Sequence, residues 1–176
     1  SDSILMKESP LRFLKVRQAI NHAIDRKKLI LYLRNSIGTA AMNGFVPVGL
    51  PGFDTAVKGY DYNPAKVRAL LQSAGYDQEH PMPTITLLTI PNYAAIGSYI
   101  VNELQQAGIP ARVEAVQKSL LLDQTSKLQV RFFRGSWLAD YPDAENYLGV
   151  FYSRHPAPPN YTRYSNPQFD LLYEKA

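Results

Sequence analysis

The sequence contains no cysteine among its 176 residues. This absence excludes disulfide bonds, cysteine-ligated metal sites and thiol catalysis. Histidine is also scarce: His22, His80 and His155 are the only three, and none lies three or four residues from another. Paired histidines at that spacing are what helical zinc sites require. We therefore predict that all three are structural or solvated, and that the chain holds no metal ion.

Long apolar runs and a strong charge of one sign are also missing. The densest apolar stretch, residues 85–90, is interrupted by Thr86 and Thr89, whereas a membrane helix needs about 18 apolar residues. The formal charge of +4 comes from 19 Lys and Arg against 15 Asp and Glu. The basic residues are dispersed along the chain, so the charge does not predict a nucleic-acid partner.

Motifs for nucleotide cofactors and for covalent catalysis are absent as well. The sequence has neither a glycine-rich phosphate-binding loop nor a Gly-x-Ser-x-Gly elbow, which position phosphates and a nucleophilic serine, respectively. We therefore predict no cofactor and no enzymatic activity. A small α/β enzyme domain remains the less favoured alternative.

The composition is that of a packed globular chain. Hydrophobic residues make up 45% and charged residues 19%, and a chain of this length forms one domain or two small ones. The first residues carry neither an initiator Met nor the pattern of a signal peptide, and residues 166–176 look like a helix interrupted in mid-pattern. We expect the sequence to be a piece excised from a longer protein.

Apolar spacing predicts three helices in the first half. Residues 10–25 and 26–33 carry apolar side chains three and four residues apart, as on one face of a helix. Glycine and proline recur over residues 38–58, which predicts a long loop. Asn63 followed by Pro64 predicts a helix start, and Gly75 predicts its end.

The next segment has the pattern of a strand, helix, strand unit. Residues 84–90 and 109–116 read as strands, and residues 91–108 as the helix between them. A connection of this length suits a right-handed parallel crossover. Residues 118–126 predict another short helix and residues 129–133 a third strand. The predicted class is α/β, with an open mixed sheet and flanking helices.

Residues 134–148 are the segment in which we expect a binding site. They follow the third predicted strand, and open α/β sheets bind ligands beyond the carboxyl ends of their strands. Trp137 is the only tryptophan, and Asp140 lies three residues beyond it. An aromatic wall beside a carboxylate suits a ligand with an ammonium group. In the alternative, Trp137 fills the core and Asp140 or Asp143 caps a following helix.

Five stretches in the same order resemble family 5 extracellular solute-binding proteins, the dipeptide- and oligopeptide-binding components of ABC importers. Residues 16–26, with the sequence VRQAINHAIDR, resemble the helix that opens the C-terminal lobe in that family. The resemblance covers about residues 10–176. The other four stretches are residues 60–64 with 70–76, residues 104–109, residues 135–143 and residues 164–170.

The resemblance implies an architecture larger than this chain. Residues 1–176 would be a single domain, the C-terminal ligand-binding lobe of a two-lobe fold like that of class II (cluster C) periplasmic binding proteins. The N-terminal lobe would be missing, and so half of the cleft. The parent protein would be periplasmic or lipid-anchored on the outer face of the membrane. Its partners would be a peptide or other small solute and an ABC permease.

The resemblance also implies roles for individual residues. Asp140 would receive the α-amino group of a bound peptide, Trp137 would line a side-chain pocket, and Arg134 would face the peptide carboxylate. Backbone groups near these positions would pair with the extended peptide. A metal chelate, an oligosaccharide or a cell-wall peptide is the alternative cargo. The predicted ligand-binding residues are Arg134, Gly135, Ser136, Trp137, Leu138, Asp140 and Tyr141.

Overall fold

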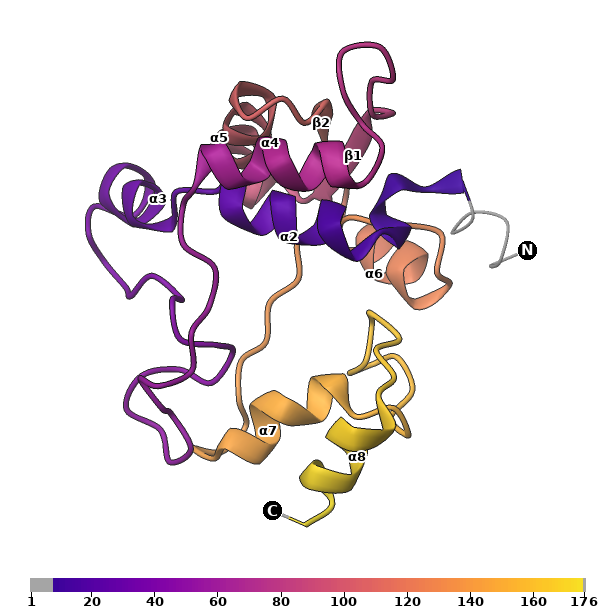
Figure 1. The fold of residues 1–176 in the computed structure, drawn as a ribbon. Helices are drawn as coiled ribbons and strands as arrows, with labels where there is room; N and C mark the ends of the chain where they lie inside the picture. The colour runs from indigo at the N-terminus through magenta and orange to yellow at the C-terminus, as the bar shows by residue number, and fades with distance from the viewer. Residues whose placement is uncertain (1–7, 176) are drawn as a thin grey trace.

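A parallel strand, helix, strand unit lies at the centre of the fold, as the sequence predicts. In the computed structural model, which describes residues 8–175, β1 (Ile85–Thr89) pairs in parallel with β2 (Ala111–Ala115). The helix α5 (Ala94–Gln106) connects the two strands and is preceded by the short 3-10 helix η2 (Pro91–Tyr93). The predicted α/β class is confirmed (Figure 1).

The predicted third strand, residues 129–133, is reduced to a single parallel bridge between Phe133 and Leu88. Leu128 has a φ of 58° just after α6 (Lys118–Ser126), and the backbone N–H of Gln129 bonds to the oxygen of Gln124 on that helix. The start of the predicted strand is therefore bonded to the end of α6, and the chain first pairs with β1 only near Phe133. In residues 8–175 the sheet is small and parallel, without the antiparallel strand that a mixed sheet requires.

The predicted helix over residues 10–25 is divided in two. The 3-10 helix η1 (Pro10–Arg12) is separated from α2 (Leu14–Ala23) by the extended residue Phe13. The second helix ends at Ala23 because Asp25 caps α3 (Arg26–Leu33), accepting hydrogen bonds from the first backbone N–H groups of that helix.

The next helix, α4 (Pro64–Ser73), begins where the sequence predicts. The side chain of Asn63 accepts a hydrogen bond from the backbone N–H of Lys66, 3.0 Å away. No helix or strand interrupts residues 34–63, in agreement with the predicted loop. The helix packs against α2, and both contribute to the same aliphatic core.

The aliphatic core joins α2, α4 and α5 to the sheet. At Gly97 in α5, a Cβ atom would lie 2.8 Å from Cγ2 of Val113 on β2. Only glycine therefore lets this helix approach the sheet so closely. The core residues are Leu11, Val16, Ala19, Ile20, Ala23, Val67, Leu71, Met82, Ile85, Leu87, Val101, Leu104, Ile109 and Ala111.

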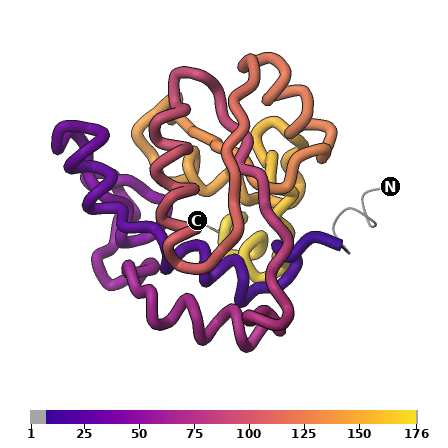
Figure 2. The backbone as a smooth tube through the Cα atoms, turned by 90° about the horizontal axis from the view of Figure 1, so that it is seen from above, coloured from indigo at the N-terminus to yellow at the C-terminus, as the bar shows by residue number. Residues whose placement is uncertain are grey.

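The C-terminal part forms a separate layer below the sheet in Figure 1 and behind it in Figure 2. It consists of α7 (Ala144–Leu148), the 3-10 helix η3 (Gly149–Phe151) and α8 (Pro167–Tyr173). These helices are short, and no helix within residues 8–175 has the length and apolar character needed to cross a membrane. The loop over residues 38–58 runs down to join this layer (Figure 1).

Aromatic side chains hold this C-terminal layer together. Phe45 from the long loop meets the rings of Phe151 and Tyr147 edge to face, with centroids 4.9 and 6.1 Å away. Geometry of this kind adds to the energy of burial alone. We call the following residues the aromatic cluster: Phe45, Tyr147, Phe151, Tyr152, His155, Tyr164, Phe169 and Tyr173.

Candidate ligand-binding site

The segment that carries the predicted site leaves the sheet at its carboxyl edge. The backbone N–H of Arg134 donates to the oxygen of Leu88 on β1 at 2.8 Å. Beyond it, residues 135–140 make no backbone to backbone hydrogen bond within the described chain. This stretch, which we call the site loop, runs from the sheet to α7 (Figure 1).

Arg134 lies at the start of the site loop, with its guanidinium over the ring of Tyr93 at 3.5 Å from the centroid. Tyr93 ends η2, directly after β1, so both residues belong to the carboxyl edge of the sheet. The stacking uses the flat face of the guanidinium. Its N–H donors have no hydrogen-bond acceptor among residues 8–175, and they point outward in the plane of the group, as anion recognition requires.

Trp137 lies outside the aliphatic core, contrary to the alternative in which it fills that core. Its indole Nε1–H donates to Oδ1 of Asn146 on α7 at 2.8 Å. The ring is partly exposed. It therefore remains available as the wall of a surface site, with its one polar atom already satisfied.

The two aspartates of the segment have different roles. Asp143 caps α7, since its side chain accepts from the backbone N–H of Glu145 at 2.8 Å. Asp140 is exposed, and its carboxylate makes no hydrogen bond or ion pair within the described chain. The capping alternative thus applies to Asp143, and Asp140 is left with a free negative charge.

Tyr141 follows Asp140 in the sequence and is held by a hydrogen bond to α7. Its hydroxyl donates to one carboxylate oxygen of Glu145, and the hydroxyl of Tyr173 on α8 donates to the other. These bonds favour the charged carboxylate and lower the pKa of Glu145, with the Tyr141 bond the larger cause. The same bond raises the pKa of Tyr141.

The remaining predicted residues form an open surface. Leu138 is 87% exposed, and Gly135 and Ser136 are exposed as well. A Cβ atom on Gly135 would only reach ordinary contact distance, 3.7 Å, from Phe133. Cavities of about 780 and 480 Å³ elsewhere in the chain include none of the seven predicted residues in their walls.

Sequence reasoning missed three residues that contact the predicted ones: Tyr93, Glu145 and Asn146. Tyr93 could have been predicted from the sequence, because it follows β1 at the same edge of the sheet from which Arg134 emerges. Nothing in the spacing of Trp137 and Asn146 indicates their hydrogen bond, since it depends on how the loop between them folds back onto α7. Within residues 8–175 no three His, Asp or Glu side chains gather as metal ligands would.

A family model supports the resemblance seen in the motifs. The model described as bacterial extracellular solute-binding proteins, family 5 Middle, matches residues 3–158. This is most of the chain. It includes the site loop and the start of the C-terminal layer.

Individual proteins show the same similarity. The heme-binding protein A of Haemophilus influenzae is 24% identical over 97% of this chain and 32% of its own length. The glutathione-binding protein GsiB of Escherichia coli is 29% identical over 99% of this chain and 35% of its own. The solved murein tripeptide binding protein MppA of Escherichia coli has the same fold, with a TM-score of 0.84 and 21% identity over 96% of this chain and 34% of its own. The chain thus spans about a third of the length of these relatives.

Proposed function

Because the chain belongs to family 5 of the bacterial extracellular solute-binding proteins, we propose that it is a ligand-binding part of the solute-binding component of an ABC importer. The observation that carries this proposal is the exposed carboxylate of Asp140, which has no partner among the described residues and lies three residues beyond the tethered indole of Trp137. The relatives described above are named for the solutes they bind, and none is named as an enzyme. Binding, rather than bond-making, is therefore the proposed activity.

The proposed ligand is a peptide with a free amino terminus. Its ammonium group pairs with Asp140, and Trp137 lines the pocket for a side chain. The backbone groups of residues 135–138 have no backbone partners among residues 8–175, so an extended peptide can add to them as a strand would. Arg134, held flat over Tyr93, is placed to receive a carboxylate of the ligand.

We further propose that the chain forms one lobe of a two-lobe clamp, with the site between the lobes. This agrees with an exposed site and with a chain about a third as long as its relatives. Closure of a second lobe would exclude water from the ion pair at Asp140. On the open surface such a pair contributes only about 0–1 kcal/mol. The 176-residue chain alone should therefore bind peptides weakly or not at all.

The place of action follows from the same proposal. An importer's solute-binding component works outside the inner membrane, either free in the periplasm or attached by a lipid. There the closed, loaded clamp would be presented to the membrane permease. Binding of the loaded protein, but not the empty one, to permease in proteoliposomes would support this step, and equal binding of both would contradict it.

Calorimetry with two peptides tests the role of Asp140. The protein expressed from its complete coding sequence would be titrated with trialanine and with N-acetyl-trialanine, as wild type and as Asp140→Asn. Truncating one member of an enclosed charge pair typically costs about 2–5 kcal/mol, so the substitution should weaken trialanine binding by about 30-fold or more. The acetylated peptide should bind weakly to both proteins.

The matched control is Asp123→Asn on α6, which removes an exposed carboxylate that pairs with Lys127 instead. It should leave both titrations unchanged. If Asp140→Asn has no effect on trialanine, or weakens both peptides equally, Asp140 is not the amine anchor.

A cargo other than an ordinary α-linked peptide is the second candidate, and the names of the relatives favour testing it. Asp140 and Arg134 offer one negative and one positive group within the same segment of the chain. Glutathione carries an ammonium group and carboxylates and can use both residues. Heme carries carboxylates and no amine, so it can use Arg134 alone. Heme binding that survives Asp140→Asn but is lost in Arg134→Ala would identify a heme-type cargo.

A further inference from the structure

Within the described chain, the site loop makes no backbone to backbone hydrogen bond that would fix its position. Residues 135–140 lie between the bond of Arg134 to β1 and the start of α7, and they contain no helix or strand. A stretch of this kind loses conformational freedom when a ligand orders it, and that loss weakens binding. Contacts that hold the site loop in place before the ligand binds should therefore increase its affinity for the ligand.

Two side chains, one in the site loop and one directly after it, attach this stretch to α7 on either side of Asp140. Trp137 donates its indole N–H to Asn146 at 2.8 Å, and Tyr141 donates its hydroxyl to Glu145. The two acceptors are neighbours on the same helix. Asp140 thus lies between two attachments, while its own carboxylate has no partner in the described chain.

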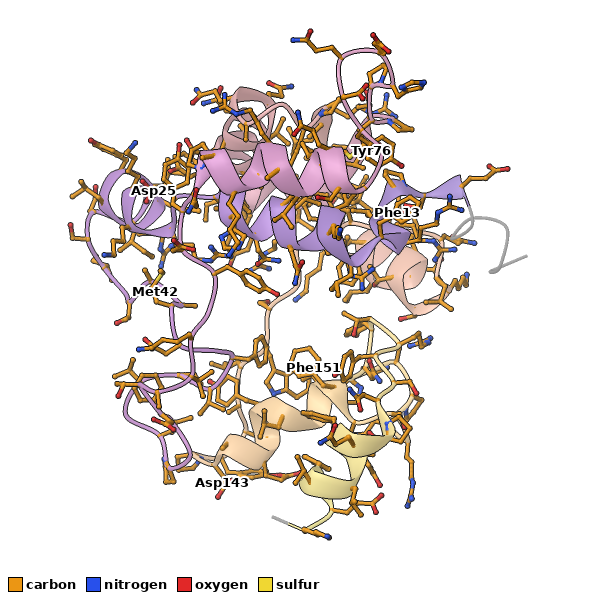
Figure 3. All side chains as sticks on the ribbon, viewed as in Figure 1. Phe13, Asp25, Met42, Tyr76, Asp143 and Phe151 are labelled. Atoms are coloured by element: carbon orange, nitrogen blue, oxygen red, sulfur yellow. The ribbon has the colours of Figure 1, made fainter. Side chains whose placement is uncertain are left out.

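The helix α7 is itself firmly placed. Asp143 caps its first turn, and Tyr173 of α8 shares the carboxylate of Glu145. Tyr147 and Phe151, within and just beyond the helix, pack on Phe45 of the long loop. Figure 3 labels Asp143 at the start of this segment and Phe151 at its other end, which faces the α/β layer. The attachments of the site loop therefore lead into the aromatic cluster.

We propose that Asn146 and Glu145 are positioning residues, which hold Trp137 and Tyr141 so that Asp140 presents its carboxylate in a fixed place. Neither residue contacts the ligand in this proposal. They act through the site loop, by ordering it before the ligand arrives. The proposal rests on the proposed function only for the identity of what binds there, because the attachment itself is a property of the chain alone.

Trp137 is the only tryptophan of the 176 residues, so in the 176-residue chain its fluorescence reports on this attachment without any ligand. We expect Asn146→Ala to free the indole, which raises its accessibility to acrylamide and moves its emission to longer wavelength. Asn146→Asp keeps an acceptor oxygen at the same reach and should restore the wild-type quenching. A variant that merely lowers stability would not be rescued in this selective way.

The matched control is Asn102→Ala, which removes an exposed asparagine of α5 whose side chain has no hydrogen-bond partner in the described chain. It should leave the quenching of Trp137 unchanged. Far-ultraviolet circular dichroism establishes that each variant is folded. Equal quenching in wild type, Asn146→Ala and Asn102→Ala would overturn the proposal.

Trialanine binding to the protein expressed from its complete coding sequence then tests whether the attachment matters for the ligand. Losing one neutral hydrogen bond should weaken binding of trialanine to Asn146→Ala by roughly 2- to 10-fold, with Asn146→Asp close to wild type. Unchanged affinity in a folded Asn146→Ala protein with a freed indole would overturn the positioning role. Failure of the wild-type protein expressed from its complete coding sequence to bind trialanine would instead contradict the peptide-binding function, and the quenching comparison in the 176-residue chain would still decide for or against the attachment.

Discussion

The two layers of the molecule are held together in different ways. In the α/β layer the largest buried side chains are aliphatic, and Leu104, Ile109 and Val67 are 0% exposed. The C-terminal layer has no fully buried hydrophobic side chain among the described residues, and its buried residues are Gly149 and Asn160. The first layer depends on burial of apolar area, and the second on ring edges and hydrogen bonds.

This difference in packing between the two layers shows which contacts fix the conformation of the proposed site. The site loop starts on the well-packed sheet and is attached at its other end to the hydrogen-bonded layer. Hydrogen bonds contribute less net free energy than aliphatic burial, so the C-terminal layer should open first under stress. The geometry around Asp140 then depends on the weaker layer, while the fold as a whole depends on the stronger.

The largest expected effect comes from breaking the aliphatic layer. Leu104→Ala leaves a cavity at a fully buried position of α5 and should lower the free energy of unfolding by about 2–5 kcal/mol. Urea denaturation followed by circular dichroism measures this. Leu172→Ala removes the same atoms from a side chain that is 61% exposed, and it should change stability by less than about 0.5 kcal/mol. Similar losses in both variants would contradict the assignment of the core.

Asn160→Ala should disturb the C-terminal layer selectively. The Asn160 side chain is 1% exposed, donates to the oxygens of Tyr152 and Tyr164, and accepts from the N–H of Tyr164 at 3.0 Å. Leaving buried backbone groups without partners costs about 1–3 kcal/mol. Hydrogen exchange should accelerate in residues 144–173 and stay slow in β1 and α5. Uniform acceleration across both layers would show that they unfold as one unit.

Tyr99 offers an alkaline probe of the α/β layer. Its hydroxyl donates to the backbone oxygen of Asp25 at 3.0 Å, and burial is the main cause that raises its pKa to about 12. Because the folded pKa lies above the ordinary value of 10, the stabilisation is complete below pH 10 and is lost as pH rises toward 12. Tyr99→Phe should remove this step and cost about 0.5–1.5 kcal/mol at neutral pH. An unchanged alkaline step in the variant would contradict the assignment.

Sequence reasoning recovered those parts of the fold that short-range physics determines. Residues 118–126 form a helix with the predicted bounds, and Asn63 caps α4 as its side chain predicts. The division at Phe13 was not predictable from periodicity, because the apolar spacing continues across it. At the start of this segment Ser9 caps the short helix η1, and at its end Asp25 caps α3, so two local caps override the periodic pattern.

The candidate site was predictable as a segment but not as a geometry. Position after a strand pointed to residues 134–148, and the choice between two aspartates for the helix cap needed the coordinates. Trp137 reaches Asn146, nine residues away, on a helix whose place depends on long-range contacts, among them the aromatic contacts with Phe45, about a hundred residues upstream. Contacts that depend on such long-range packing leave no local signal in the sequence.

The smallest expected effect is an acid-induced loosening of the site loop. Hydrogen bonds from Tyr141 first, and then from Tyr173, hold the pKa of Glu145 below its ordinary value of 4.5. For a carboxyl group whose folded pKa is lowered, the stabilisation is present above the ordinary value and is lost as pH falls through the folded one. Because Glu145 is exposed, the contribution to global stability is small.

Acrylamide quenching of Trp137 should therefore rise below about pH 4.5, while circular dichroism still shows an intact α/β layer. In Glu145→Gln, the quenching of Trp137 at neutral pH should equal that of the wild type at acid pH, and it should not change further as the pH falls. Glu114→Gln on β2, which removes an exposed carboxylate far from α7 in sequence, should keep it. If the quenching and the circular dichroism change together, the two layers share one transition, and the difference between them has no consequence for the site.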